Sequence, residues 1–261
     1  MNAMFCGCNA LESLDISSFN TEAVTNMTSM FSYCNAIKSL DLKHFETPKL
    51  TDMNAMFLDC FALEYLDVST FNTSKVRDMS SAFQSCKVLE SLNLGNFVTT
   101  SLVKMSHMFH NCKALKSLDL HNFYTPNLEN MNDIFSECDL LESVDISNFD
   151  TSKVSDMTGL FYNCFALKSL EIQNFDTSLV TSMAKMFRGC TQLTTLDITH
   201  FKTELVKDIS QMFDQCHILT SLYISNFNTP LLENIHNIFY NCHSLTFLDI
   251  SNLNTSKCQS F

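Results

Sequence analysis

Residues 63–86, LEYLDVSTFNTSKVRDMSSAFQSC, hold one copy of a pattern that runs through the whole chain. Its leucine, phenylalanine, threonine and cysteine positions return every 26 residues, with no insertion or deletion. The cysteine position shows the register most clearly, at Cys8, Cys34, Cys60, Cys86, Cys112, Cys138, Cys164, Cys190, Cys216 and Cys242. A fixed period of this length predicts a solenoid of about ten stacked units, in which each unit buries its apolar residues against its neighbours.

Each unit divides into two parts. Around Leu66 and Val68 apolar and polar residues alternate, which predicts a strand of four or five residues. Between residues 76 and 86 the apolar residues fall on one face of a helix, and Thr47-Pro48 suits an N-cap followed by a first-turn proline. We therefore expect a short parallel β-sheet on one face of the solenoid and one to three helical or 3₁₀ turns on the other. The pattern does not distinguish α-helix from 3₁₀-helix or a looser arc.

The repeat also carries a family resemblance. Residues 24–47 follow Val-x-x-Met-x-x-Met-Phe-x-x-Cys-x-x-Leu-x-x-Leu-Asp-Leu-Ser-x-Phe-x-Thr, with Ile37 for the first leucine and Lys43 for the serine. This motif resembles the 26-residue bacterial surface-protein repeat of mycoplasma lipoproteins, which is related to BspA-like leucine-rich repeats. The resemblance spans the whole chain. It implies a leucine-rich-repeat-like solenoid and an extracellular adhesion or interaction role, and it brings no catalytic residues.

The unbroken register predicts a single solenoid over residues 1–261 without an internal domain boundary. Met1 and Phe261 share one repeat position, so the chain starts and stops mid-repeat, and we expect it to be a segment of a longer protein. It contains no signal peptide and no apolar run long enough to span a bilayer. We therefore expect the chain to reach the cell surface or the medium as part of that longer protein, and a cytoplasmic location is the alternative.

An acidic position is the most informative candidate site. It is occupied at Asp15, Asp41, Asp67, Asp119, Asp145, Asp197 and Asp249, by glutamate at Glu171, and by Asn93 and Tyr223. Because it lies between two apolar strand positions, these side chains should point outward on the concave sheet. The row could receive a basic partner or divalent cations. The alternative is a solvated face whose carboxylates bond to the local backbone.

Aromatic residues interrupt the same face at Tyr65, Tyr223 and Phe247, and exposed aromatics on a repeat surface commonly anchor partners. Tyr223 and Phe247 lie one coil apart and form the best single patch, unless a cap or a flanking repeat covers it. The partner-binding candidates are thus Asp67, Asp119, Asp145, Asp197, Tyr65, Tyr223 and Phe247.

The sequence gives little indication of disulfide bonds, metal sites, phosphate-binding loops or catalytic residues. The cysteine column is expected to be a row of buried free thiols rather than a disulfide framework. The eight histidines show no metal-ligand spacing, and no loop is built to hold phosphate. We therefore expect no catalytic residues, no metal and no cofactor. A net charge of −12 argues against nucleic acid and against anionic membranes as partners.

These features favour an adhesion or protein-interaction module that binds a protein or glycan partner, host molecules included, through its concave sheet. An intracellular scaffold and a structural spacer without a ligand are the alternatives, and an enzyme is not expected. The chain is expected to be a monomer whose open ends could stack end to end.

Overall fold

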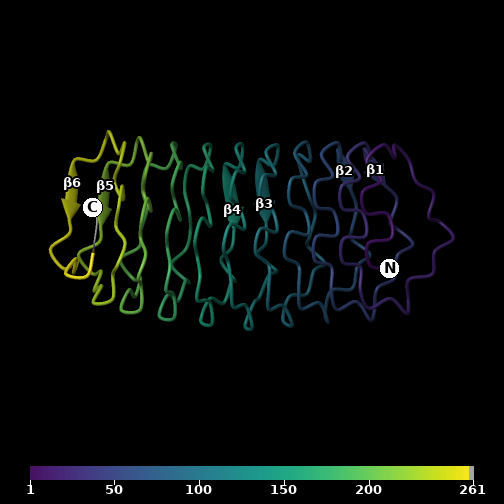
Figure 1. The fold of residues 1–261 in the computed structure, drawn as a ribbon, viewed down its shortest axis with the longest axis horizontal. Coiled ribbons are helices and arrows are strands. Elements are labelled where there is room, and N and C mark those ends of the chain that lie inside the picture. Colours follow the sequence, from purple (N-terminus) through teal and green to yellow (C-terminus); the bar gives the residue numbers. More distant parts are fainter. Residues whose placement is uncertain (259–261) are drawn as a thin grey trace.

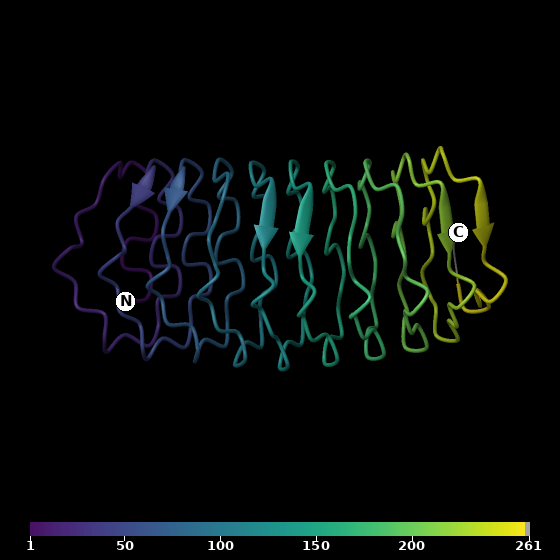
Figure 2. The ribbon, with the colours of Figure 1, turned by 180° about the vertical axis from the view of Figure 1, so that it is seen from behind.

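The protein is a stack of similar coils that follow one another along a single long axis (Figure 1). The computed structural model describes residues 1–258, so Phe261 lies outside the described residues. The two termini lie at opposite ends of the stack, and every coil passes once along each side of it (Figure 2). None of residues 1–258 forms a helix long and apolar enough to cross a membrane.

One side of the stack carries short parallel strands. They form three separate pairs: β1 (Ser39–Leu40) with β2 (Tyr65–Leu66), β3 (Ser117–Asp119) with β4 (Ser143–Asp145), and β5 (Ser221–Tyr223) with β6 (Phe247–Asp249). Equivalent repeat positions are paired, as in Asp119 with Asp145. The middle residue of each three-residue strand points inward, and the flanking residues face solvent in β3 and β4.

These strands are shorter than the four or five residues expected, because a turn closes at each end. In the coil of β3, Leu115 N–H donates to Cys112 O over 3.3 Å before the strand begins. After it, His121 N–H donates to the carboxylate of Asp119 over 3.0 Å and Phe123 N–H donates to Leu120 O over 2.8 Å. Two local turns therefore leave only the residues between them free to pair with a neighbour.

The expected helical or 3₁₀ face is wrong: residues 1–258 contain no helix. The segment beginning at Met27 instead forms consecutive turns. Alternate N–H groups of residues 27–33 donate to carbonyl oxygens of the next coil over 2.7–2.9 Å, whereas Met30 N–H closes a turn on Met27 O over 3.1 Å. A helix would direct all of these groups along its own axis. Bonding between coils thus replaces bonding within a helix.

The backbone of this segment makes the change of direction possible. Ser29 and Tyr33 have positive φ angles of 54° and 61°, and the same two positions are left-handed in every coil, from Ala3 and Gly7 to Asn237 and Asn241. A left-handed residue breaks the helical path and turns the following peptide toward the neighbouring coil. The inward residues are still separated by steps of three residues and one residue, which is why their spacing resembled one face of a helix.

The core is a set of ladders in which identical residues stack. Phe5 to Phe239 form one continuous ladder, with ring centroids 5.4–6.0 Å apart and planes within 9° of parallel. The cysteines run beside it. Each buried thiol donates to the carbonyl of a phenylalanine in the preceding coil, as Cys112 Sγ does to Phe83 O over 3.0 Å. All twelve cysteines are free thiols.

The sequence predicted that the threonine position is a helix N-cap. This prediction is wrong, because residues 1–258 contain no helix for it to cap. Thr151 is buried, and its hydroxyl donates to Asp176 O over 2.9 Å while accepting from Asp176 N–H over 2.7 Å. Both groups of Asp176 belong to the next coil. The threonine column is therefore a second ladder that holds adjacent coils in register.

Replacing Thr151 with valine should reduce the free energy of unfolding by about 2–4 kcal/mol, because valine keeps the shape but leaves the N–H and C=O of Asp176 unpartnered. Thr151→Ser keeps the hydroxyl and should recover most of the loss. Thr194→Val, at an exposed position, is the matched control. Urea unfolding followed by circular dichroism measures all three. Equal stability of the valine and serine variants would show that the hydroxyl is not what stabilises the junction.

Candidate functional site

The exposed strand residues form one surface, which we call the sheet face: the outward residues of β1–β6 and the equivalent residues of the coils between them. Its central part is a shallow hollow of about 460 Å³ that Asp119, Asp145 and Glu171 line together with serines. These acidic residues come from three consecutive coils. The outward direction expected for Asp119 and Asp145 is what the structure shows, since both are exposed.

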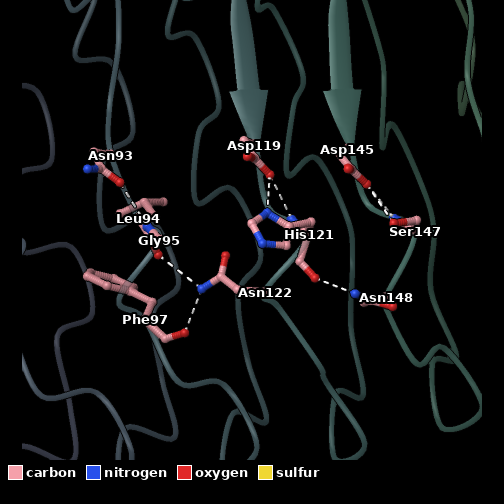
Figure 3. A network of polar contacts seen from close by, with 10 residues as sticks. All are labelled: Asn93, Leu94, Gly95, Phe97, Asp119, His121, Asn122, Asp145, Ser147 and Asn148. Carbon is pink, nitrogen blue, oxygen red and sulfur yellow. Dashed lines mark hydrogen bonds and ion pairs between the residues drawn. The ribbon is translucent and has the colours of Figure 1, made fainter.

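The carboxylates of the sheet face are held by short local hydrogen bonds (Figure 3). Oδ1 of Asp145 accepts from Ser147 N–H over 3.1 Å and from Ser147 Oγ over 2.7 Å. Oδ1 of Asp119 accepts from His121 N–H over 3.0 Å and lies 2.7 Å from His121 Nδ1. One oxygen of each carboxylate is thus used locally. None of the described residues bonds the other oxygen of either, which faces solvent.

Local hydrogen bonds also lower the pKa of three aspartates of the sheet face. Hydrogen bonds from the side chain and then the backbone of Ser69 lower the pKa of Asp67, and those of Thr199 do the same for Asp197. The backbone and then the side chain of His121 lower the pKa of Asp119. Asp67, Asp119 and Asp197 therefore stay ionised to a lower pH than an ordinary aspartate. Local backbone bonding, the alternative raised from the sequence, accounts for one oxygen of each of Asp67, Asp119, Asp145 and Asp197 and leaves the charge in place.

His121 gives the centre of the sheet face a titratable cation. Its hydrogen bond to Asp119, followed by the charge of Asp119, raises the pKa of the imidazole above its ordinary value. Asp119 and His121 are both exposed, so the pair lies in water. Protonation of His121 therefore offsets part of the negative charge of the hollow as the pH falls toward 6.

The aromatic residues lie toward the C-terminal end of this face. Tyr223 and Phe247 are about half exposed, and their ring centroids are 5.5 Å apart. Tyr223 also lines a second hollow of about 410 Å³ with Asp197 and Glu171. The structure thus joins Asp197 and the aromatic pair to the acidic centre through Glu171.

Tyr65 and Asp67 lie apart from this cluster. Tyr65 is the most exposed of the three aromatic candidates, at 61%, and Asp67 is half-buried. The coil of Asn93 separates them from Asp119. They are on the same face but contribute to neither hollow.

A ladder of asparagine side chains in the turns that follow the strands was not anticipated from the sequence. Asn122 Nδ2 donates to Phe97 O over 2.7 Å and to Leu94 O over 3.1 Å in the preceding coil (Figure 3). Asn174 bonds in the same way to Phe149 O and Ile146 O. The signal was available, because asparagine precedes the phenylalanine of this column at Asn96, Asn122, Asn148, Asn174 and Asn226.

This ladder positions the site. It ties the turn that follows each strand to the turn of the preceding coil, and that turn contains the residue that bonds the aspartate. No group of three or more histidine, cysteine, aspartate or glutamate side chains among residues 1–258 is arranged to hold a metal ion. The geometry therefore offers a fixed, charged contact surface.

Comparison with known proteins bears on the whole chain. A family model described as "Mycoplasma protein of unknown function, DUF285" matches residues 1–89, 30–149, 78–191 and 164–261. No curated protein matches the chain. These four overlapping matches confirm the resemblance that the 26-residue motif indicated.

Several solved structures are similar to this chain. A leucine-rich repeat protein from Eubacterium ventriosum is 14% identical, with a TM-score of 0.50 over 89% of this chain and 84% of that one. A leucine-rich repeat protein of T. pallidum is 19% identical over 65% of this chain and 72% of that one, with a TM-score of 0.45. A leucine-rich cell surface protein from Faecalibacterium prausnitzii is 17% identical over 93% of this chain and 73% of that one, with a TM-score of 0.44.

At these identities the likeness concerns the fold alone, and the first of the three structures supports a leucine-rich-repeat-like solenoid. Membership rests on the family matches, which together extend from residue 1 to residue 261. The chain belongs to the DUF285 family of mycoplasma repeat proteins.

Proposed function

We propose that the protein is a binding module that holds a polypeptide partner against its sheet face and acts in adhesion at the cell surface. The observation that carries this proposal is the joined surface of Asp119, Asp145, Glu171, Asp197 and Tyr223, in which two hollows share Glu171. Ionised carboxylates select lysine and arginine side chains, and Tyr223 with Phe247 supplies an apolar anchor beside them.

The surface suits binding better than catalysis because its groups are fixed and alike. Asp119, Asp145 and Asp197 each have one oxygen bonded locally and the other exposed, so three coils present the same kind of acceptor. An extended basic peptide can satisfy such a row one coil at a time. A glycan partner on this face would use the same acceptors through its hydroxyl groups, without the charge complementarity.

A labelled lysine-rich peptide with a central tryptophan is the probe for this proposal. Fluorescence anisotropy should show salt-sensitive binding to the wild-type chain, and a variant with Asp119→Asn, Asp145→Asn and Tyr223→Ala should bind at least about tenfold more weakly. The matched control replaces Glu204 and Glu233 with glutamine and Tyr124 with alanine, all exposed and outside the sheet face. Equal loss in the two variants would point to net charge alone and defeat the proposal.

Binding of this probe should weaken as the pH falls from 8 to 5.5. The raised pKa of His121 means that its positive charge is present at pH 5.5 and is lost as the pH rises through that pKa, so it competes with the probe most strongly at the lower pH. We expect about a threefold difference for an exposed pair of this kind. The variant His121→Asn should bind equally at both pH values. Retention of the full pH dependence in that variant would assign it to another group.

Surface location has its own test. Protease treatment of intact native cells, followed by immunoblotting against these repeats, should remove the signal if the protein acts in adhesion. Full protection of the signal, together with cleavage after lysis, would instead favour the intracellular scaffold.

A further inference from the structure

A second concave feature lies away from the sheet face. It is a groove of about 570 Å³, which we call the edge groove, and its lining includes Thr51, Lys75, Arg77, Ser101, Glu129 and Lys153. Thr51, Arg77 and Glu129 occupy one repeat position in different coils, and the position two residues earlier holds Lys75, Ser101 and Lys153. None of the residues that line the edge groove lines either hollow of the sheet face.

The edge groove is basic in an acidic protein. Lys75, Arg77 and Lys153 line it together with a single carboxylate, that of Glu129, although the chain as a whole has a net charge of −12. Six other lysine and arginine residues form ion pairs with aspartate or glutamate, whereas no ion pair within residues 1–258 includes the three cations of the groove. These three charges are therefore available to an anion.

Two hydroxyl groups of the groove, those of Thr51 and Ser101, can only accept further hydrogen bonds. Thr51 Oγ1 donates to Thr25 O over 2.9 Å, and Ser101 Oγ donates to Ser74 O over 2.8 Å. A hydroxyl has one hydrogen, so both oxygens are left with lone pairs alone. A ligand that fits must therefore combine anionic groups with hydrogen-bond donors of its own.

The groove is also periodic along its length. Parallel bridges join Asp52 to Asp78 and Asp78 to Lys104, directly beside Arg77, so equivalent residues recur about every 4.8 Å. One such step is close to the length of a sugar ring in a linear polysaccharide. Successive rings of one glycan chain could thus meet equivalent positions of successive coils.

We propose that the edge groove binds a linear acidic glycan, whose carboxylate or sulfate groups meet Lys75, Arg77 and Lys153 and whose hydroxyl groups donate to Thr51 and Ser101. A deoxyribonucleotide chain fits less well, because its phosphodiester groups carry no hydrogen-bond donors for the hydroxyl oxygens of Thr51 and Ser101. This site is independent of the polypeptide site on the sheet face.

Isothermal titration calorimetry with a heparin-derived hexasaccharide tests the proposal on the whole chain. We expect binding to the wild type, a loss of at least about tenfold in the variant with Lys75→Glu and Arg77→Glu, and a change of less than about twofold in the control with Lys116→Glu and Lys168→Glu. The control changes the charge equally at exposed lysines outside the groove. Thermal unfolding verifies that both variants are folded.

A second variant separates a sugar site from a simple anion site. Thr51→Val with Ser101→Ala keeps every charge and should still weaken the hexasaccharide about threefold or more, because the acceptors are lost. The proposal is overturned if the hexasaccharide does not bind, if the control loses as much affinity as the groove variant, or if this charge-neutral variant binds as tightly as the wild type. It is equally overturned if a DNA oligonucleotide or polyglutamate of matched charge competes as well as the hexasaccharide.

Discussion

Raising the pH from 8 to 10 should unfold the array, because its buried cysteine ladder cannot ionise in place. Burial raises the pKa of Cys60 and of Cys112 to about 12, and it raises the pKa of Cys86 and Cys138 as well. In the unfolded chain the thiols have their ordinary pKa of about 8.5. Above that value the unfolded state loses protons that the folded state retains, so stability is complete at lower pH and falls as the pH rises toward the folded pKa.

The size of this effect follows from the number of thiols. Each fully buried cysteine costs about 1.4 kcal/mol of stability for every pH unit above its unfolded pKa. Eight of the cysteines are buried. One pH unit is therefore worth about 11 kcal/mol in total, which is comparable to the whole stability of an ordinary domain. Urea unfolding between pH 7 and 10 should show a midpoint that is flat below pH 8 and then falls steeply.

Two matched variants test the assignment to the ladder. Cys112→Ala with Cys138→Ala removes two buried thiols and should reduce the alkaline slope by about 2.7 kcal/mol per pH unit. Cys6→Ala with Cys8→Ala removes two exposed thiols and should leave the slope unchanged. The slopes are compared rather than the absolute stabilities, because alanine in the core also leaves a cavity. Equal slopes in both variants would assign the alkaline transition to other groups.

Replacing Phe109 with alanine should reduce the free energy of unfolding by about 3–5 kcal/mol. Phe109 is fully buried, and its ring stacks on Phe83 at 5.7 Å and on Phe135 at 5.9 Å. The substitution removes both contacts and leaves a cavity that the rigid coils on either side cannot close. Phe165→Ala, at a ring that is 38% exposed, is the control and should cost less than about 1 kcal/mol.

The position of Phe109 near the middle of the array has a second consequence. Stability in a repeat protein arises mainly between neighbouring units, so a weakened junction lets the two halves unfold separately. Urea unfolding of the Phe109 variant should therefore become broader or show two steps. Hydrogen exchange should report faster exchange on both sides of the coil of Phe109. A single transition with the wild-type slope and a loss below about 1 kcal/mol would contradict the ladder as the main source of cohesion.

The sequence was most informative where one residue type had to recur. The columns of Phe83 and Cys86 point inward because an array without a central core can bury apolar groups only between neighbours. The same regularity showed that Asp119 and Asp145 would lie side by side and face outward. Stacking in register needs no long-range information beyond the period, so these parts could be read from the pattern alone.

The backbone path of the second half of each coil could not be read in this way. Apolar spacing between Val76 and Cys86 fits a helix, and it fits consecutive turns with a left-handed residue at Ser81 and Ser85 equally well. The choice depends on where the N–H groups find acceptors, and those acceptors belong to the next coil. The sequence pattern of one unit indicates only the hydrogen bonds that this unit can make by itself, and those are the bonds of a helix.

The same distinction applies to the binding surfaces: some of their features follow from the sequence, and others follow only from the way the coils stack. The sequence by itself determined the solenoid, its register, the inward ladders and the acidic and aromatic residues of the sheet face. Only the tertiary structure decided that Thr151 bonds across coils, that Asp197 and Tyr223 share a hollow, and that Lys75 and Lys153 line one groove although 78 positions separate them in the sequence. The physical reason is that a column is a property of one unit repeated, whereas a groove or a ladder bond is formed between units and depends on how they stack.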